Sequence, residues 1–153
     1  MKFIKFSQSL KSAFVLVILA FMWGCGGGGG STPNDVVSTV ASVSVVRSSN
    51  TEYVIQGNNL VGVAAVELVV SYDSTTLSSP TVTNGGLFPG ALFAANPQFT
   101  PSSIKIAFVS ATDMSGTGQL AKISFASATG SGTVSIVSAN TINSKLEQIP
   151  ITF

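Results

Sequence analysis

The stretch Gly62-Val63-Ala64-Ala65-Val66-Glu67-Leu68-Val69-Val70-Ser71-Tyr72 decides the fold. It is rich in β-branched residues and predicts a long β-strand, whose side chains point alternately to the two faces of a sheet. Because an unpaired buried carboxylate is costly, Glu67 marks the face that points to solvent. The core face then carries Ala64, Val66, Leu68, Val70 and Tyr72, and the outer face carries Val63, Ala65, Glu67, Val69 and Ser71.

Further strands are expected on both sides of this stretch. Val, Ile, Thr, Phe and Ser dominate the chain from about residue 42 onward, and Gly, Asn, Pro and Ser pairs interrupt it at short intervals. No helical period and no internal repeat is present. The expected strands are 41–47, 52–56, 62–72, 81–83, 92–95, 103–110, 119–126, 132–138 and 146–153, with a turn at 57–59. Many short strands separated by turns favour a two-sheet sandwich.

The strands expected at 103–110 and 119–126 supply much of the remaining core. In the first strand, Ile104, Ile106 and Phe108 point inward, and Lys105, Ala107 and Val109 point outward. In the second strand, Ala121, Ile123 and Phe125 point inward, and Lys122 and Ser124 point outward. Leu120 is expected on the side opposite to Ala121. The core is therefore expected to be aliphatic and phenylalanine-rich, under outer faces of small side chains with few charges.

The composition excludes several classes of function. The chain has 153 residues, no histidine and one cysteine, so it can build neither a Cys/His metal site, nor a Ser–His or Cys–His nucleophile pair, nor an intramolecular disulfide. Beyond residue 25, four basic residues face six acidic ones, which gives a net charge of −2. That balance does not favour nucleic acid as a partner. We therefore expect no metal and no cofactor.

Residues 1–24 are expected to be a signal peptide, with lysines near the start and an uncharged apolar segment at 13–23. Gly24 precedes the single Cys25 and a run of glycines follows, which resembles a bacterial lipobox. Met22 and Trp23 stand where that pattern commonly has Leu and a small residue. The resemblance implies that Cys25 is lipidated, that 25–41 is a flexible tether, and that 42–153 is the folded domain. An ordinary secretory peptide with an incidental cysteine is the alternative.

The deciding stretch, extended through Asp73 and Leu77, resembles the third-strand signature of cohesin domains. The segments Gly118-Gln119-Leu120-Ala121-Lys122-Ile123-Ser124-Phe125 and Ile104-Lys105-Ile106-Ala107-Phe108-Val109 are similar to two later strands of the same family. The order and spacing agree from about residue 43 to residue 153. The resemblance implies an all-β, jelly-roll β-sandwich of about nine strands, in which Asp73 accepts hydrogen bonds from the following turn and Leu77 returns to the core.

The same resemblance implies a function. Cohesins bind dockerins, which are small calcium-dependent helical modules, and in cellulosomes this binding assembles enzymes that degrade plant cell-wall polysaccharides. The dockerin lies on the outer face of one sheet. The matching positions here are Ala65, Glu67, Lys105, Ala107 and Val109. Glu67 keeps a carboxylate that family members often have, whereas Ala65 lacks the common amide, and Ser110 or Ala111 stands where another carboxylate is often found. We expect Glu67 to be the main polar anchor.

Other readings remain open. A carbohydrate-binding module of the same fold would need exposed aromatic rings, but Trp23 lies in the leader and Tyr53 and Tyr72 look embedded in strands. An accessory lipoprotein of a secretion or pilus system is a further alternative. An enzyme is not expected, because the acidic residues are scattered and share no motif. The main expectation is a non-catalytic protein-binding module on a lipoprotein of the bacterial envelope. The outer membrane or cell surface is favoured because Gly26, not Asp, follows the cysteine.

Overall fold

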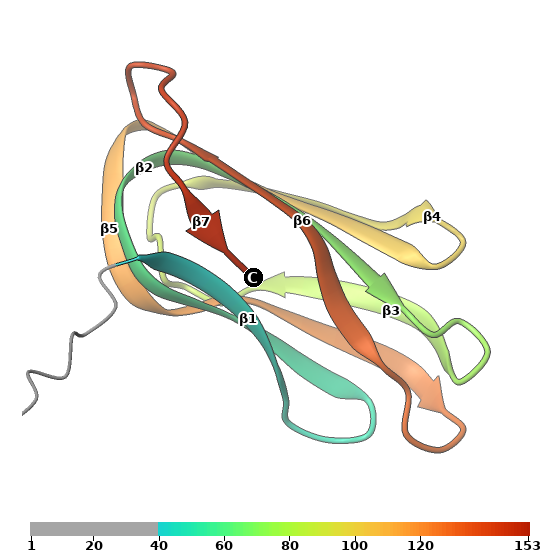
Figure 1. The fold of residues 1–153 in the computed structure, drawn as a ribbon. Coiled ribbons are helices and arrows are strands. Elements are labelled where there is room, and N and C mark those ends of the chain that lie inside the picture. The colour runs from blue at the N-terminus through green and yellow to red at the C-terminus, as the bar shows by residue number, and fades with distance from the viewer. Residues whose placement is uncertain (1–39) are drawn as a thin grey trace, which may run out of the picture. The chain divides into compact units, whose positions relative to one another are not determined.

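The computed structural model describes residues 40–153, and every regular element in this part of the chain is a β-strand, as predicted (Figure 1). The predicted signal peptide, Cys25 and nearly all of the predicted tether lie outside the described residues. The elements are β1 (Ala41–Arg47), β2 (Glu52–Tyr72), β3 (Leu77–Asn84), β4 (Leu92–Thr100), β5 (Ser103–Ala128), β6 (Val134–Ile142) and β7 (Ile151–Thr152). No helix in residues 40–153 is long and apolar enough to cross a membrane.

The long strands β2 and β5 bend sharply and run through both layers of the fold (Figure 1). The hydrogen-bonded order is β3-β5-β2-β1-β7, while β4 also pairs with β5 and β6 with β2. One layer therefore contains β3, the second half of β5, the first half of β2, β1 and β7. The other layer contains β4, the first half of β5, the second half of β2 and β6. This arrangement confirms the predicted β-sandwich.

The bends explain why the sequence predicts more strands than the structure has. Each long strand corresponds to two predicted strands, so the predicted turn at 57–59 is wrong and these residues remain inside β2. Asn59 and Gly62 take positive φ values of 49° and 69° at the bend. Their N–H groups donate to Thr117 Oγ1 at 2.8 Å and to Ser115 Oγ at 2.9 Å, which ties the bend of β2 to that of β5.

Irregular pairing at the bends also corrects two predicted orientations. Val63 was expected to face outward but is fully buried, because the pairing register with β5 shifts on both sides of it. Leu120 was expected opposite to Ala121, yet both are fully buried. Ile55 pairs with Ala121 and its neighbour Gln56 pairs with Gln119, so Leu120 is the extra residue of a bulge.

The other predicted core positions are confirmed. Leu68, Val70, Ile104, Ile106, Phe108 and Ile123 have no exposed surface, and Ala64, Val66, Tyr72, Leu77 and Phe125 are at most 9% exposed. Phe88 joins them from the segment between β3 and β4, and its ring packs edge-on against Phe108 with the centroids 6.2 Å apart. A buried apolar cluster of this size supplies the main folding free energy without a disulfide.

The turn after β2 forms as predicted. Asp73 Oδ1 accepts hydrogen bonds from the Thr75 N–H at 3.0 Å and from the Thr75 hydroxyl at 2.6 Å. These bonds to Thr75 hold the pKa of the Asp73 carboxyl below its usual range. Leu77 then returns to the core and begins β3.

The chain's last predicted strand, 146–153, is largely wrong. Only Ile151 and Thr152 form β7, which pairs in parallel with the start of β1. The preceding residues fold into a loop because Asn143 Oδ1 accepts the N–H groups of both Lys145 and Glu147 at 2.9 Å. Local side-chain hydrogen bonds of this kind compete with strand pairing.

Candidate functional site

The predicted partner-binding residues gather on the outer surface of the layer β4-β5-β2-β6, which we call the small-residue face. The pairing register arranges this face in rows across the four strands. The first row is Leu92, Val109, Ala65 and Ile142; the second is Ala94, Ala107, Glu67 and Asn140; the third is Asn96, Lys105, Val69 and Ser138. The structure thus brings Ala65, Glu67, Lys105, Ala107 and Val109 together, and their role in binding stays a prediction.

The β5, β2 and β6 members of the first two rows line an open depression of about 280 Å³. Ala65 and Ala107 leave room in it, since neither side chain extends beyond Cβ. Val109 and Ile142 form its apolar side, and Glu67 and Asn140 form its polar side. Val109 is 48% exposed and its neighbour Leu92 is 70% exposed. A surface that combines small side chains with exposed apolar ones is suited to close contact with another protein.

Glu67 forms an ion pair with Lys105 on this face. Its Oε2 atom lies 3.0 Å from Lys105 Nζ, and the two side chains are 44% and 36% exposed respectively. Lys105 Nζ also lies 5.4 Å from the centre of the Phe99 ring. An ion pair this exposed contributes only about 0–1 kcal/mol, so a partner can compete for either charge. The expected polar anchor is therefore a carboxylate–ammonium pair.

The loop at 143–147 adds a feature that the sequence pattern does not predict. Leu146 is 79% exposed and has a positive φ of 66°, which is uncommon for a residue with a branched side chain. Within the loop, Asn143 Oδ1 accepts two backbone N–H groups. The Ser144 N–H donates to Asp113 Oδ1 of β5 at 2.7 Å. The loop thus presents a large apolar side chain from a fixed backbone.

This loop directly follows Ile142, the β6 member of the first row of the small-residue face. It projects from the same end of the sandwich as the bends of β2 and β5 (Figure 1). The only available signal in the sequence is Asn143, which favours a turn. The exposure of Leu146 could not be derived from that signal, because the strand pattern of 146–153 predicts a half-buried side chain.

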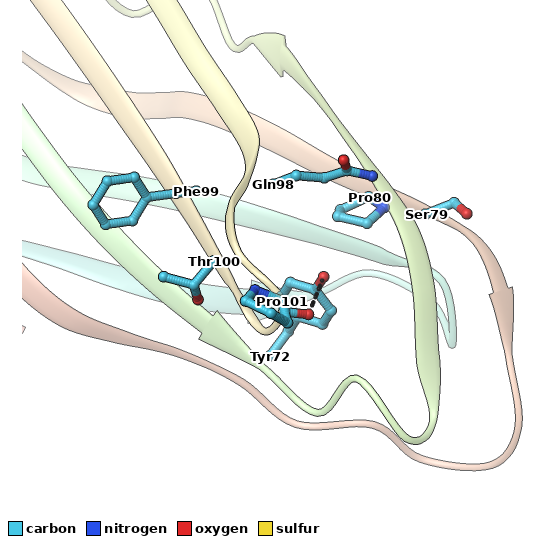
Figure 2. A pocket seen from close by; sticks show the side chains of 7 residues that line it. All are labelled: Tyr72, Ser79, Pro80, Gln98, Phe99, Thr100 and Pro101. Atoms are coloured by element: carbon cyan, nitrogen blue, oxygen red, sulfur yellow. Dashed lines mark hydrogen bonds between the residues drawn. The ribbon is translucent and has the colours of Figure 1, made fainter.

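A second hollow of about 400 Å³ lies between β3 and the turn that joins β4 to β5 (Figure 2). Tyr72, Pro80 and Pro101 contribute to it, together with the polar residues Ser79, Gln98 and Thr100. None of these residues belongs to the small-residue face. The alternation in residues 62–72 predicts that Tyr72 lies in the core, which its burial confirms, but no pattern in the sequence indicates the hollow.

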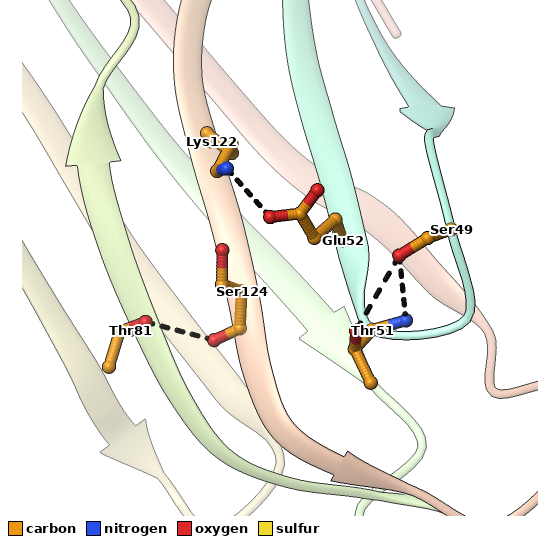
Figure 3. A network of polar contacts seen from close by, with 6 residues as sticks. All are labelled: Ser49, Thr51, Glu52, Thr81, Lys122 and Ser124. Atoms are coloured by element: carbon orange, nitrogen blue, oxygen red, sulfur yellow. Dashed lines mark hydrogen bonds and ion pairs between the residues drawn. The ribbon is translucent and has the colours of Figure 1, made fainter.

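The outer surface of the other layer is polar and internally bonded (Figure 3). Lys122 Nζ and Glu52 Oε1 form an ion pair at 2.6 Å across β5 and β2. On the adjoining strand, the Thr81 hydroxyl donates to the Ser124 carbonyl at 3.0 Å. These polar groups of β2, β3 and β5 therefore bond one another across the layer.

Acidic side chains do not converge on a common point in the described part of the chain. Within residues 40–153, no three Cys, Asp or Glu side chains lie close enough to hold a metal ion. Glu52 and Glu67 each pair with a lysine, and Asp73 and Asp113 accept hydrogen bonds from loop groups. All four of these carboxylates therefore take part in contacts within the fold.

Solved structures of known proteins share this architecture. No protein-family model and no curated protein sequence matches the chain. Solved cohesins do match it. The OlpC cohesin–dockerin complex from Clostridium thermocellum gives 18% identity, a TM-score of 0.62 and coverage of 74% of this chain and 88% of the other. A non-cellulosomal cohesin from Archaeoglobus fulgidus gives 18% identity and a TM-score of 0.60, with coverage of 74% and 83%.

A third match is the sixth cohesin of scaffoldin B from Acetivibrio cellulolyticus, solved in complex with a Cel5 dockerin. It gives 20% identity, a TM-score of 0.58 and coverage of 74% of this chain and 93% of the other. Nearly the whole length of each of these cohesins is therefore matched by the sandwich described above. The expectation drawn from the deciding stretch is confirmed at the level of architecture: this chain has the fold of cohesin domains.

Proposed function

We propose that the chain is a non-catalytic, cohesin-type module that binds a protein partner through the small-residue face. The cohesin fold supports this proposal, because two of the matched structures are complexes in which a cohesin binds a dockerin. The observation that carries it is the depression lined by the small residues Ala65 and Ala107 and bordered by exposed apolar side chains. A helix of a partner can approach the strands closely at such small residues.

The polar groups on this face favour a partner that carries hydrogen-bond donors. Glu67 and Asn140 flank one side of the depression, and Glu67 shares its charge with Lys105. A partner hydroxyl or amide can donate to Glu67 while a partner carbonyl accepts from Lys105. Charge-assisted hydrogen bonds of this kind are stronger than neutral ones and orient the bound partner. Leu146 would then contact an apolar part of the partner beyond the first row.

Site-specific photocrosslinking tests the proposal. A photoreactive amino acid at Ala94 or at Leu146 is expected to form covalent adducts with the same secreted protein of the host. Ala94 lies in the second row of the face, and both positions are exposed. The matched control is Thr83, which is exposed on the other layer. Adducts of equal yield from Thr83, or none from Ala94, would contradict the proposed face.

We further propose that the module is held at the bacterial cell envelope through a lipid on Cys25. The glycine run at 26–30 supports this, because a glycine-rich segment acts as a flexible tether between an anchor and a domain. Gly26 supports sorting to the outer membrane. The cysteine is the only one in the chain, so acylation has a single possible sulfur target.

Replacing Cys25 by Ser is expected to abolish lipid labelling. Cells grown with a clickable palmitate analogue should label the wild-type chain and leave Cys25→Ser unlabelled, because Ser lacks the thiol that receives the diacylglycerol. On membrane fractionation of the same cells, the wild-type chain should be recovered with the outer membrane, and Cys25→Ser should be recovered as a soluble exported form. Equal labelling of both chains would show that Cys25 is not the lipid attachment site.

A further inference from the structure

The sandwich has strand edges that lack a neighbouring strand. Another chain can add a strand at such an edge, because the N–H and C=O groups along it are unpaired. Within residues 40–153, β3 and β4 pair with another strand on one side only, and β1 and β6 do so over most of their length. Native edges are usually protected by proline, by a bulge or by an irregular backbone. The four edges differ in whether they carry such features.

Three of the four edges are protected. β3 contains Pro80, which has no N–H to donate, next to Ser79 with its positive φ of 50°. β4 contains Pro97, and its pairing with β5 is irregular beyond Asn96. In β6, a register shift against β2 leaves Val137 as an extra, unpaired residue. Each of these features disfavours a further strand along that edge.

The edge of β1 carries no such protection. Its pairing with β2 is continuous from Ser42 to Arg47, and the strand contains neither a proline nor a residue with positive φ. On its other side, β7 pairs only with Ala41 and Ser42. Figure 1 shows β7 beside the start of β1, with the rest of β1 running on to its hairpin with β2. Residues 44–47 therefore form an open edge in the described part of the chain.

The hairpin after β1 determines which backbone groups point to this open edge. The Ser48 N–H donates to the Glu52 carbonyl at 2.9 Å. Backbone groups in an antiparallel pair alternate between the two sides of a strand, so the N–H and C=O of Val46 point to β2. Those of Val45 and Arg47 point to the open edge. The Val46 side chain lies on the outer surface of the layer and is 49% exposed, an apolar exception on a surface that is otherwise polar.

The open edge is complementary to itself. If a second copy pairs antiparallel to it with the two Val46 residues opposite each other, Val45 of each copy lies opposite Arg47 of the other. All the outward N–H and C=O groups of these residues then bond across the pair, and the two exposed Val46 side chains cover each other. The two arginines are not opposite each other, so no like charges meet. We propose that two copies of this chain associate through the edge of β1, in a symmetric contact that joins their sheets.

Disulfide trapping of the full chain in cells that export it tests this contact. Opposed Val46 residues would form a pair with Cα atoms about 4.5 Å apart, within the roughly 4.4–6.8 Å that a disulfide spans. The variant Val46→Cys is therefore expected to give a product of twice the chain's mass on a non-reducing gel, which a reductant returns to the single chain. The matched control is Val109→Cys, which makes the same change at a valine 48% exposed on the small-residue face. It should give no more of this product than the wild type, whose yield reports any disulfide through Cys25.

Adding Val45→Pro to Val46→Cys should remove the trapped dimer. Proline deletes an N–H that points to the open edge and leaves the ladder with β2 intact, a position where edge strands tolerate it; circular dichroism checks that the sheet is kept. No dimer from Val46→Cys, or equal yields from Val46→Cys and Val109→Cys, would overturn the proposal. A trapped product of another mass would show that a different protein occupies the edge, and would overturn it as well. The small-residue face takes no part in this contact, so these outcomes leave the proposed function unaffected.

Discussion

Replacing Leu68 by Ala is expected to lower the free energy of unfolding by about 2–5 kcal/mol, because it removes buried methyl groups and leaves a cavity. Leu68 has no exposed surface. It lies in the second half of β2, between Ile106 of β5 and Ala139 of β6. A loss of this size is a large part of the total stability of a single domain, which is about 5–15 kcal/mol.

Urea unfolding of the wild type and the variant measures this loss. The matched control is Val109→Ala, which shortens an apolar side chain that is 48% exposed on the outer surface of the same layer. Its effect should stay below about 1 kcal/mol, because surface substitutions rarely cost more. A loss below that value for Leu68→Ala would mean that the core of this layer is much looser than its burial indicates.

The same alternation that predicts the effect at Leu68 predicts most of the sandwich. In the regular parts of β2 and β5, side chains keep a strict period of two, so one charged residue fixes the orientation of all the others. Glu67 does this for β2, and Lys105 does it for the first half of β5. At the bends the period fails, because an extra residue at Leu120 and the register shifts around Val63 place consecutive residues in the core. Nothing in the local sequence marks those shifts.

Continuity of the long strands also could not be predicted. Gly57 and the two asparagines after it form a typical turn sequence. Here they continue β2, because hydroxyls on the facing bend of β5 accept the N–H groups of Asn59 and Gly62. These bonds join residues more than fifty positions apart in the chain. A local pattern carries no information about such a pairing.

The candidate site was predictable as a face but not as a set of contacts. Alternation places Ala65 and Glu67 on the outer side of one strand, and Lys105 and Ala107 on the outer side of another. The cohesin resemblance implies that both strands contribute to the same binding face. The pairing register shows that Glu67 lies directly beside Ala107 and diagonal to Lys105, which permits the ion pair. The contribution of Leu146 depends on the fold of the loop at 143–147, and that fold depends on hydrogen bonds from Asn143 and to Asp113.

Replacing Ala107 by Arg is expected to abolish binding of the partner identified by crosslinking, with a loss of at least about 100-fold. Ala107 lines the depression and lies between Ala94 and Glu67 in the second row. The long side chain would fill the space that a partner's backbone needs. Its guanidinium would also reach Glu67 and hold that carboxylate in a new ion pair.

The fold should tolerate this change, because the Ala107 side chain points outward and is partly exposed. Unfolding in urea should therefore give nearly the same midpoint for Ala107→Arg and the wild type. The control for binding is Thr83→Arg, which adds the same side chain to the outer surface of the other layer, at an exposed position of β3. Surface plasmon resonance should show full affinity for Thr83→Arg and none for Ala107→Arg. If both variants keep the wild-type affinity, the partner binds away from the small-residue face; if both lose it, the added charge and not its position is responsible.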